Sequence, residues 1–177
     1  MTGLSGSVRS AAIFLTTRTE SRKYAKKEMM NDGMFASGSD DWETPQEFFE
    51  AIDRIFHFDL DVCATSANAK CERYFTKAEN GLSKTWSGIC WMNPPYGREI
   101  SLWVQKAYES SLKNGTIIVC LLPARTDTRW WHNYVIAHAQ SVKFIKGRLR
   151  FSGKGPAPFP SALVIFGRLS HDEKEVT

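Results

Sequence analysis

The chain has 177 residues, of which 42% are hydrophobic and 12% aromatic, enough for one well-buried core but too few for two. Its four cysteines and four histidines match no zinc-binding spacing, so no metal site is expected. Because no apolar run approaches the length of a membrane-spanning helix, we expect no membrane segment. A single-domain cytoplasmic protein with reduced thiols fits these observations best.

The formal net charge of +4 is distributed unevenly along the chain. Residues 39–123 carry eight Lys and Arg against twelve Asp and Glu, a net −4, whereas residues 124–170 carry eight against one, a net +7. An acidic half followed by a basic half is expected if one side binds a small cation and the other a polyanion. A basic face that is merely solvated explains the same pattern equally well.

Composition divides the chain into three regions. Residues 1–38 mix Gly, Ser, Thr and scattered charges without a sustained period, which predicts a flexible N-terminal extension. Residues 39–168 contain the periodic apolar segments and are predicted to form the folded domain. Residues 169–177 are predicted to be a C-terminal tail.

The first predicted element is a helix over residues 45–56. Thr44 is the predicted N-cap, Pro45 the first helical residue and Glu47 the partner of Thr44 in a capping box. The apolar residues that follow form one stripe, as in a helix that packs on a core.

A strand is predicted next, over residues 56–63, because apolar and polar residues alternate there. Ligands of open α/β sheets bind beyond the carboxyl ends of strands, which makes Asp61 a candidate ligand contact. A structural capping role for Asp61 is the alternative. Only 28 residues separate Ala64 from Asn93, so the sheet is expected to be trimmed here, with one short strand over 72–76.

A rigid turn follows the short apolar run 89–92. Its residues are Asn93-Pro94-Pro95-Tyr96, in which the two prolines fix φ and supply no backbone N–H. The Asn93 side-chain oxygen and the Pro94 carbonyl can accept hydrogen bonds, and Tyr96 offers a flat ring. This combination suits an NH₂ group on a flat heterocycle. As a bare tetrapeptide it is also common in surface turns.

The rest of the chain continues the α/β alternation. Residues 100–112 are predicted to form a helix, and 116–122 a strand buried on both faces because the run is continuously apolar. A helix over 127–138 should precede two strands, 142–146 and 162–166. The connection between these strands has no room for a crossover helix, so they should pair antiparallel.

Several short motifs, taken together, resemble the phage-type Dam DNA N6-adenine methyltransferases, over about residues 34 to 167. The motifs are Trp42, Thr44-Pro45, Asp61-Val62-Cys63-Ala64, Asn80-Gly81-Leu82, Asn93-Pro94-Pro95-Tyr96, Gly147-Arg148 and Phe159-Pro160-Ser161. The resemblance implies a Rossmann-like methyltransferase fold: an α/β protein with a mostly parallel sheet that ends in an antiparallel hairpin. It further implies a bacterial host cell and a phage or prophage gene, with restriction-modification among the roles left open.

The implied reaction transfers a methyl group from S-adenosylmethionine to the N6 amine of adenine in double-stranded DNA, with the base flipped out of the duplex. The catalytic residues implied by the resemblance are Asn93, Pro94, Pro95 and Tyr96, with Tyr96 stacking on the base. The implied cofactor contacts are Thr44, Pro45, Asp61, Cys63, Ala64, Asn80 and Leu82. On charge, we assign DNA phosphate contacts to Arg125, Arg129, Arg148, Arg150 and Lys154.

Three alternatives keep the same fold. The substrate could be RNA or a protein amide, since the turn residues would be the same. Cytosine N4 is a weaker alternative, because a leading Ser or Thr is commoner in those enzymes. The third is a non-catalytic DNA-binding module, which the absence of a Gly-rich turn at residues 63–67 favours slightly.

Overall fold

The computed structural model of the protein describes residues 42–153 and 155–168. The predicted N-terminal extension, the C-terminal tail and the assignment of Lys154 to a DNA contact lie outside these residues.

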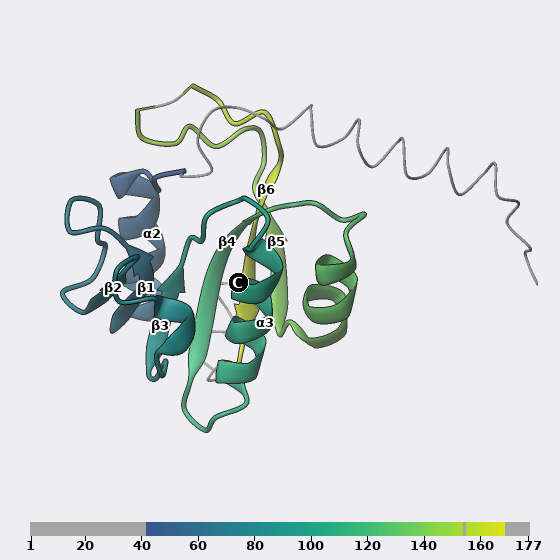
Figure 1. Ribbon diagram of the computed structural model, residues 1–177. Coiled ribbons are helices and arrows are strands. Elements are labelled where there is room, and N and C mark those ends of the chain that lie inside the picture. Colours follow the sequence, from purple (N-terminus) through teal and green to yellow (C-terminus); the bar gives the residue numbers. More distant parts are fainter. Residues whose placement is uncertain (1–41, 154, 169–177) are drawn as a thin grey trace, which may run out of the picture. The chain divides into compact units, whose positions relative to one another are not determined.

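The described chain is a mixed α/β fold built on a six-stranded sheet of order β2-β1-β3-β4-β6-β5 (Figure 1). The strands β2, β1, β3 and β4 are parallel, and β6 is antiparallel to both β4 and β5. The antiparallel pairing predicted for the last two strands is therefore confirmed. The strand bounds are β1 Leu60–Ala64, β2 Tyr74–Thr76, β3 Ile89–Met92, β4 Ile117–Pro123, β5 Ser141–Phe144 and β6 Ser161–Phe166.

Among the described residues, the helix α2 Gln46–Phe56 precedes β1, and three helical segments lie between strands: the 3-10 turn η1 Gly81–Ser83, α3 Ile100–Ser111 and η2 Trp131–Ile136. The helices predicted over 45–56, 100–112 and 127–138 are found within two residues of their predicted bounds, whereas η1 was not predicted. The segment η2 differs from expectation because its hydrogen bonding is of the π type, inside a helical stretch that runs over 129–138.

The predicted capping box at the start of α2 is wrong. Pro45 is the N-cap, its carbonyl accepts the Phe49 N–H at 3.0 Å, and no side chain caps the helix. The Thr44 hydroxyl instead bonds to the side chain of Asn93. The helix thus begins one residue later than predicted, because a tertiary contact takes the hydroxyl that a local cap would use.

The helices α2 and α3 cover opposite faces of the sheet. The Phe49 ring of α2 contacts Trp91, with ring centroids 5.4 Å apart. The Tyr108 ring of α3 contacts Phe166, which is paired with Ile118 of β4, and Ile118 is in turn paired with Cys90 of β3. Because paired residues point to the same face of a sheet, α3 covers the face to which Cys90 points. Side chains alternate along a strand, so Trp91 and Cys90 point to opposite faces. The residue two positions after Trp91 is Asn93, which accordingly points to the α2 side.

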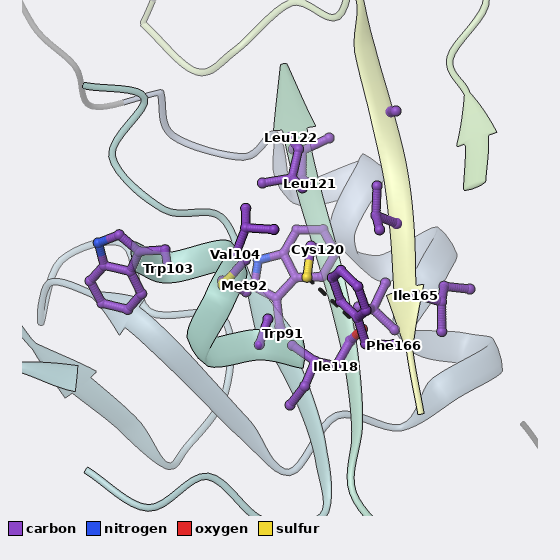
Figure 2. Packing of buried hydrophobic residues seen from close by; sticks show 14 of the residues in the cluster. Trp91, Met92, Trp103, Val104, Ile118, Cys120, Leu121, Leu122, Ile165 and Phe166 are labelled. Atoms are coloured by element: carbon purple, nitrogen blue, oxygen red, sulfur yellow. Dashed lines mark hydrogen bonds between the residues drawn. The ribbon is translucent and has the colours of Figure 1, made fainter. Parts of the chain in front are cut away.

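The core is continuous across β3, β4 and β6. Every residue of β4 is buried, which confirms the expectation from its continuous apolar sequence. Figure 2 shows Trp91, Val104 and Phe166 packed around this strand, all of them buried. A rigid sheet of this kind fixes the positions of the residues that follow β1, β3 and β4.

Candidate functional site

The residues that follow β1 and β3 lie at one edge of the sheet. Asp61 is paired with Trp91, and the two strands are parallel. Cys63 and Asn93, each two residues further along, therefore lie beside each other at the carboxyl ends of β1 and β3. The Asn93 backbone N–H lies beside the Cys63 sulfur and lowers the pKa of that thiol slightly, but burial raises it far more and keeps the thiol neutral. Two of the predicted motifs are therefore in contact at the edge where ligands of α/β sheets bind.

The Asn93 side-chain amide is held by the segment that precedes α2. Its nitrogen Nδ2 donates to the Trp42 carbonyl oxygen and, at 2.9 Å, to the Thr44 hydroxyl. Its oxygen Oδ1 is buried and has no hydrogen-bond partner among the described residues. Because a backbone carbonyl can only accept, the nitrogen must face Trp42, and the oxygen remains for another donor.

Asp61 holds the loop that follows β1. Its two carboxylate oxygens accept the backbone N–H groups of Cys63 at 3.2 Å and Lys70 at 3.1 Å. The side chain is buried, and this burial raises the pKa of the carboxyl from 3.8 to about 6, although the backbone donors lower it. These contacts favour the capping interpretation of Asp61; its predicted contact with a cofactor stays a prediction.

The raised pKa of Asp61 makes a prediction about stability. The folded state binds the Asp61 proton more tightly than the unfolded state, so the stabilisation is fully present below pH 3.8 and is lost as the pH rises through about 6. A shift of this size corresponds to about 3 kcal/mol. The free energy of unfolding of the wild type, minus that of Asp61→Asn, should fall by about this amount across that pH window. Urea titrations of both proteins measure it, and parallel pH curves would contradict the prediction.

The segment Asn80–Leu82 lies against β1. A Cβ atom added to Gly81 would overlap the Val62 carbonyl oxygen, and the Gly81 carbonyl accepts the Trp86 indole N–H at 2.9 Å. Asn80 has a left-handed backbone, with φ of 54°, and begins η1. This packing places Asn80 and Leu82 next to the strand that carries Asp61; their contact with a cofactor stays a prediction.

We expect Gly81→Ala to destabilise the fold by about 2 kcal/mol or more, because the new methyl group must displace backbone. Gly155→Ala is the matched control, since a Cβ there meets nothing within 4 Å. Thermal unfolding of the two variants tests this, and equal melting temperatures would show that the Gly81 contact is not tight.

The Tyr96 ring is buried rather than open to a ligand. Its hydroxyl donates to the Leu121 carbonyl at 3.1 Å, and only 2% of the residue is exposed. The rings of Phe151 and Phe159 pack on it edge to face, at centroid distances of 6.1 and 5.5 Å. Burial raises the pKa of this phenol well above its usual range. Stacking of Tyr96 on a base, which the sequence led us to expect, requires these rings to move.

Phe151 and Phe159 join Trp42 and Tyr96 in one aromatic cluster. Trp42 contacts Phe151 and Phe159 at centroid distances of 5.3 and 5.0 Å. The Ser152 N–H also donates to the Glu43 carbonyl at 3.0 Å. The cluster ties the loop between β5 and β6 to the Asn93 turn, and Phe151 was not among the residues singled out in the sequence.

Of the described basic residues assigned to DNA, Arg125 lies in the loop after β4 and Arg129 begins the helical stretch 129–138, whereas Arg148 and Arg150 lie in the β5–β6 loop. Arg129, Arg148 and Arg150 are exposed, and Arg125, just beyond β4, is half-buried. Arg148 and Arg150 belong to a two-stranded ribbon that is closed by the pairing of Arg150 with Pro156 and by the bond from the Ala157 N–H to the Leu149 carbonyl, 2.9 Å. This ribbon is the part of the β5–β6 loop that the aromatic cluster anchors.

Metal-binding clusters and membrane-spanning helices are both absent from the residues that the structure describes. In this part of the chain, no group of three or more His, Cys, Asp or Glu residues could hold a metal ion. Within the same residues, no helix is both long and apolar enough to cross a membrane.

A mixed α/β sheet with an Asn-Pro-Pro-Tyr turn at the carboxyl edge of its parallel strands is consistent with a methyltransferase-like fold. Residues 32–164 match the family model described as DNA N-6-adenine-methyltransferase (Dam). Because this match covers most of the chain, the protein belongs to the Dam family, as its motifs predicted.

Two curated relatives carry the same description. The DNA N-6-adenine-methyltransferase of Haemophilus phage HP1 is 33% identical over 112 residues, which are 62% of this chain and 64% of the phage protein. That of Escherichia phage T1 is 36% identical over 93 residues, 51% of this chain and 38% of its own length. The chain thus spans less than two thirds of the length of either relative.

Proposed function

We propose that this protein transfers a methyl group from S-adenosylmethionine to the N6 amine of adenine in DNA. The proposal rests on the orientation of the Asn93 amide. Its nitrogen donates to two acceptors within the protein, and its buried oxygen has no partner among the described residues. A donor such as an aromatic NH₂ group would satisfy that oxygen. The family and the two phage relatives support adenine in DNA as the source of that group.

The residues at the carboxyl edge of β1 suit a cationic cofactor. Asp61, with a pKa of about 6, is ionised at neutral pH and places a negative charge beneath the loop that follows β1. Cys63 and Ala64 are small, so their side chains leave room for a ligand near the backbone that follows β1. We propose that Asp61, Cys63, Ala64, Asn80, Leu82 and Pro45 hold the cofactor; Thr44, the other residue implied as a cofactor contact, bonds to Asn93 instead. Bound there, S-adenosylmethionine supplies an activated methyl group.

The chain's own contribution to the reaction is the position of the substrate amine. The exocyclic nitrogen of adenine is a poor nucleophile because its lone pair is delocalised into the ring. If the Asn93 oxygen and the Pro94 carbonyl each accept one N–H, the nitrogen becomes pyramidal and its lone pair is directed away from the ring. Both acceptors also stabilise the positive charge that develops on the N–H groups; this charge makes the N–H acidic, so the proton released on methylation can pass to water without a separate general base.

Access of the base requires a change at the aromatic cluster. The target atom is held inside the duplex until the nucleotide flips out. In the described structure the Asn93 oxygen is buried and Tyr96 is covered by Phe151 and Phe159. We propose that DNA binding through Arg148 and Arg150 moves the β5–β6 loop, so that Tyr96 can stack on the flipped adenine.

The fold supports this function at a general level. We propose that it is a Rossmann-like methyltransferase fold, with β6 inserted antiparallel between β4 and β5, and that it is trimmed between β1 and β3. The short β2 and η1 are the elements found between those two strands, and the tight packing of Gly81 on β1 supports a reduced connection there.

The test of the substrate class is a competition assay with S-adenosylmethionine labelled in its methyl group. Equal amounts of unmethylated double-stranded DNA, RNA and denatured protein are offered together, and label is counted in each fraction. Label in the DNA is the expected result. Label in RNA or protein would identify that molecule as the substrate in place of DNA. No label, together with no calorimetric binding of the cofactor, would favour a non-catalytic DNA-binding module.

A further inference from the structure

The Thr44 hydroxyl contacts the Asn93 amide in the folded protein, whereas the resemblance of the sequence implied a cofactor contact. We infer that Thr44 and the Trp42 carbonyl are positioning groups, which lock the Asn93 side chain with its oxygen facing the substrate amine. This inference rests on the proposed function and extends it to a role for two residues before α2.

The two contacts together leave only one orientation of the amide. Each hydrogen of Nδ2 has its own acceptor, the Trp42 carbonyl and the Thr44 hydroxyl. A rotation by 180° would bring Oδ1 against the Trp42 carbonyl, so two acceptors would face each other. It would also present an NH₂ group to the substrate NH₂ group, which cannot then donate. A correctly oriented amide is therefore a requirement for accepting the substrate N–H.

The fold explains why Thr44 rather than a neighbour of Asn93 performs this role. Strand alternation directs Asn93 to the face covered by α2, and the residues just before α2 reach the same edge of the sheet. Thr44 is 2% exposed, so water does not compete for its hydroxyl. The hydrogen bond is thus available to fix a side chain before any ligand arrives.

A positioning role and a cofactor contact predict different kinetics. If Thr44 orients Asn93, removing its hydroxyl should lower kcat and leave the KM for S-adenosylmethionine nearly unchanged. If Thr44 binds the cofactor, the same change should weaken cofactor binding, and kcat at saturation should be restored. The distinction can be made on the full-length chain.

The experiment compares Thr44→Val, which keeps the shape of the side chain, with Thr44→Ser, which keeps the hydroxyl. We expect kcat of Thr44→Val to be about 10- to 100-fold lower and that of Thr44→Ser to be within about threefold of wild type. Thr116→Val is the matched control, because Thr116 is similarly buried but precedes β4 at the opposite edge of the sheet. Thr44→Ala replaces Thr44→Val if the latter does not fold.

A second readout does not depend on activity. The two side-chain N–H signals of Asn93 are identified in a ¹⁵N-correlated NMR spectrum as the pair that Asn93→Ala lacks. In Thr44→Val one of these protons has no acceptor, so its signal should move and exchange faster with water, whereas Thr44→Ser should resemble wild type.

The outcomes separate the two proposals. Unchanged Asn93 signals and an unchanged kcat in Thr44→Val would overturn the positioning role, as would a loss confined to cofactor affinity. If the wild-type protein methylates no nucleic acid, the proposed function fails. The NMR comparison then decides the positioning role alone: altered signals support it and unaltered signals overturn it.

Discussion

Replacing Asn93 by alanine is expected to lower kcat for methyl transfer by about 100- to 1,000-fold, the range found when one preorganised hydrogen-bonding group is removed from a transition state. The structure gives the reason, because the Asn93 oxygen is the buried acceptor that both Nδ2 contacts leave without a partner. Cofactor affinity should change little, since the amide is assigned to the substrate amine. Steady-state kinetics and calorimetry of the same preparations measure the two effects.

A matched control separates this effect from a loss of folding. Asn93→Ala also removes the hydrogen bonds that Nδ2 donates to the Trp42 carbonyl and the Thr44 hydroxyl, which should cost about 1 to 3 kcal/mol of stability. Asn114→Ala makes the same chemical change at an exposed position after α3, at the opposite edge of the sheet. If Asn114→Ala lost as much activity as Asn93→Ala, the turn would have no special part in the reaction.

The second large effect is expected on DNA binding. Reversing the charges of Arg148 and Arg150 should weaken affinity about 10-fold or more and reduce the slope of log affinity against log salt by about 2, because each lost phosphate contact removes about 0.9. Both side chains are exposed on the ribbon of the β5–β6 loop. Fluorescence anisotropy with a labelled duplex, measured across a series of salt concentrations, gives both quantities.

The control for this prediction changes the same charge elsewhere. The double variant Arg54→Glu and Lys113→Glu also takes the formal net charge from +4 to 0. Both residues are exposed, but Arg54 lies in the last turn of α2 and Lys113 follows α3, at the opposite edge of the sheet. The control should keep most of the salt slope. If both double variants lost affinity equally, only the net charge would matter, and the loop would not be a DNA contact.

Much of the fold could be predicted because its signals are local. The continuous apolar run over 116–122 predicted a strand buried on both faces, and every residue of β4 is buried. The short connection before β6 predicted antiparallel pairing with β5, which the structure has. The start of α2 could not be predicted from local signals. Thr44 has the residue type and spacing of an N-cap, but its hydroxyl bonds to a residue 49 positions away in the chain. A local rule cannot anticipate such a contact.

For the candidate site, the sequence could predict which motifs lie near one another but not the contacts that their side chains make. The motifs around Asp61, Asn80 and Asn93 meet at one edge of the sheet, as strand polarity implies. Phe151 and Phe159 cover Tyr96 because the β5–β6 loop folds back onto the Asn93 turn. The spacing of aromatic residues in that loop does not predict this folding back. The buried oxygen of Asn93 likewise appears only when the partners of Nδ2 are known.

The most direct test of the account is the identity of the methylated nucleoside. Unmethylated DNA is incubated with the protein and S-adenosylmethionine, digested to nucleosides and analysed by mass spectrometry, with Asn93→Ala and Asn114→Ala in parallel. N6-methyldeoxyadenosine is the expected product with wild type and Asn114→Ala, with a loss of about 100-fold or more for Asn93→Ala. Methylation of another base, or equal product from Asn93→Ala, would contradict this expectation.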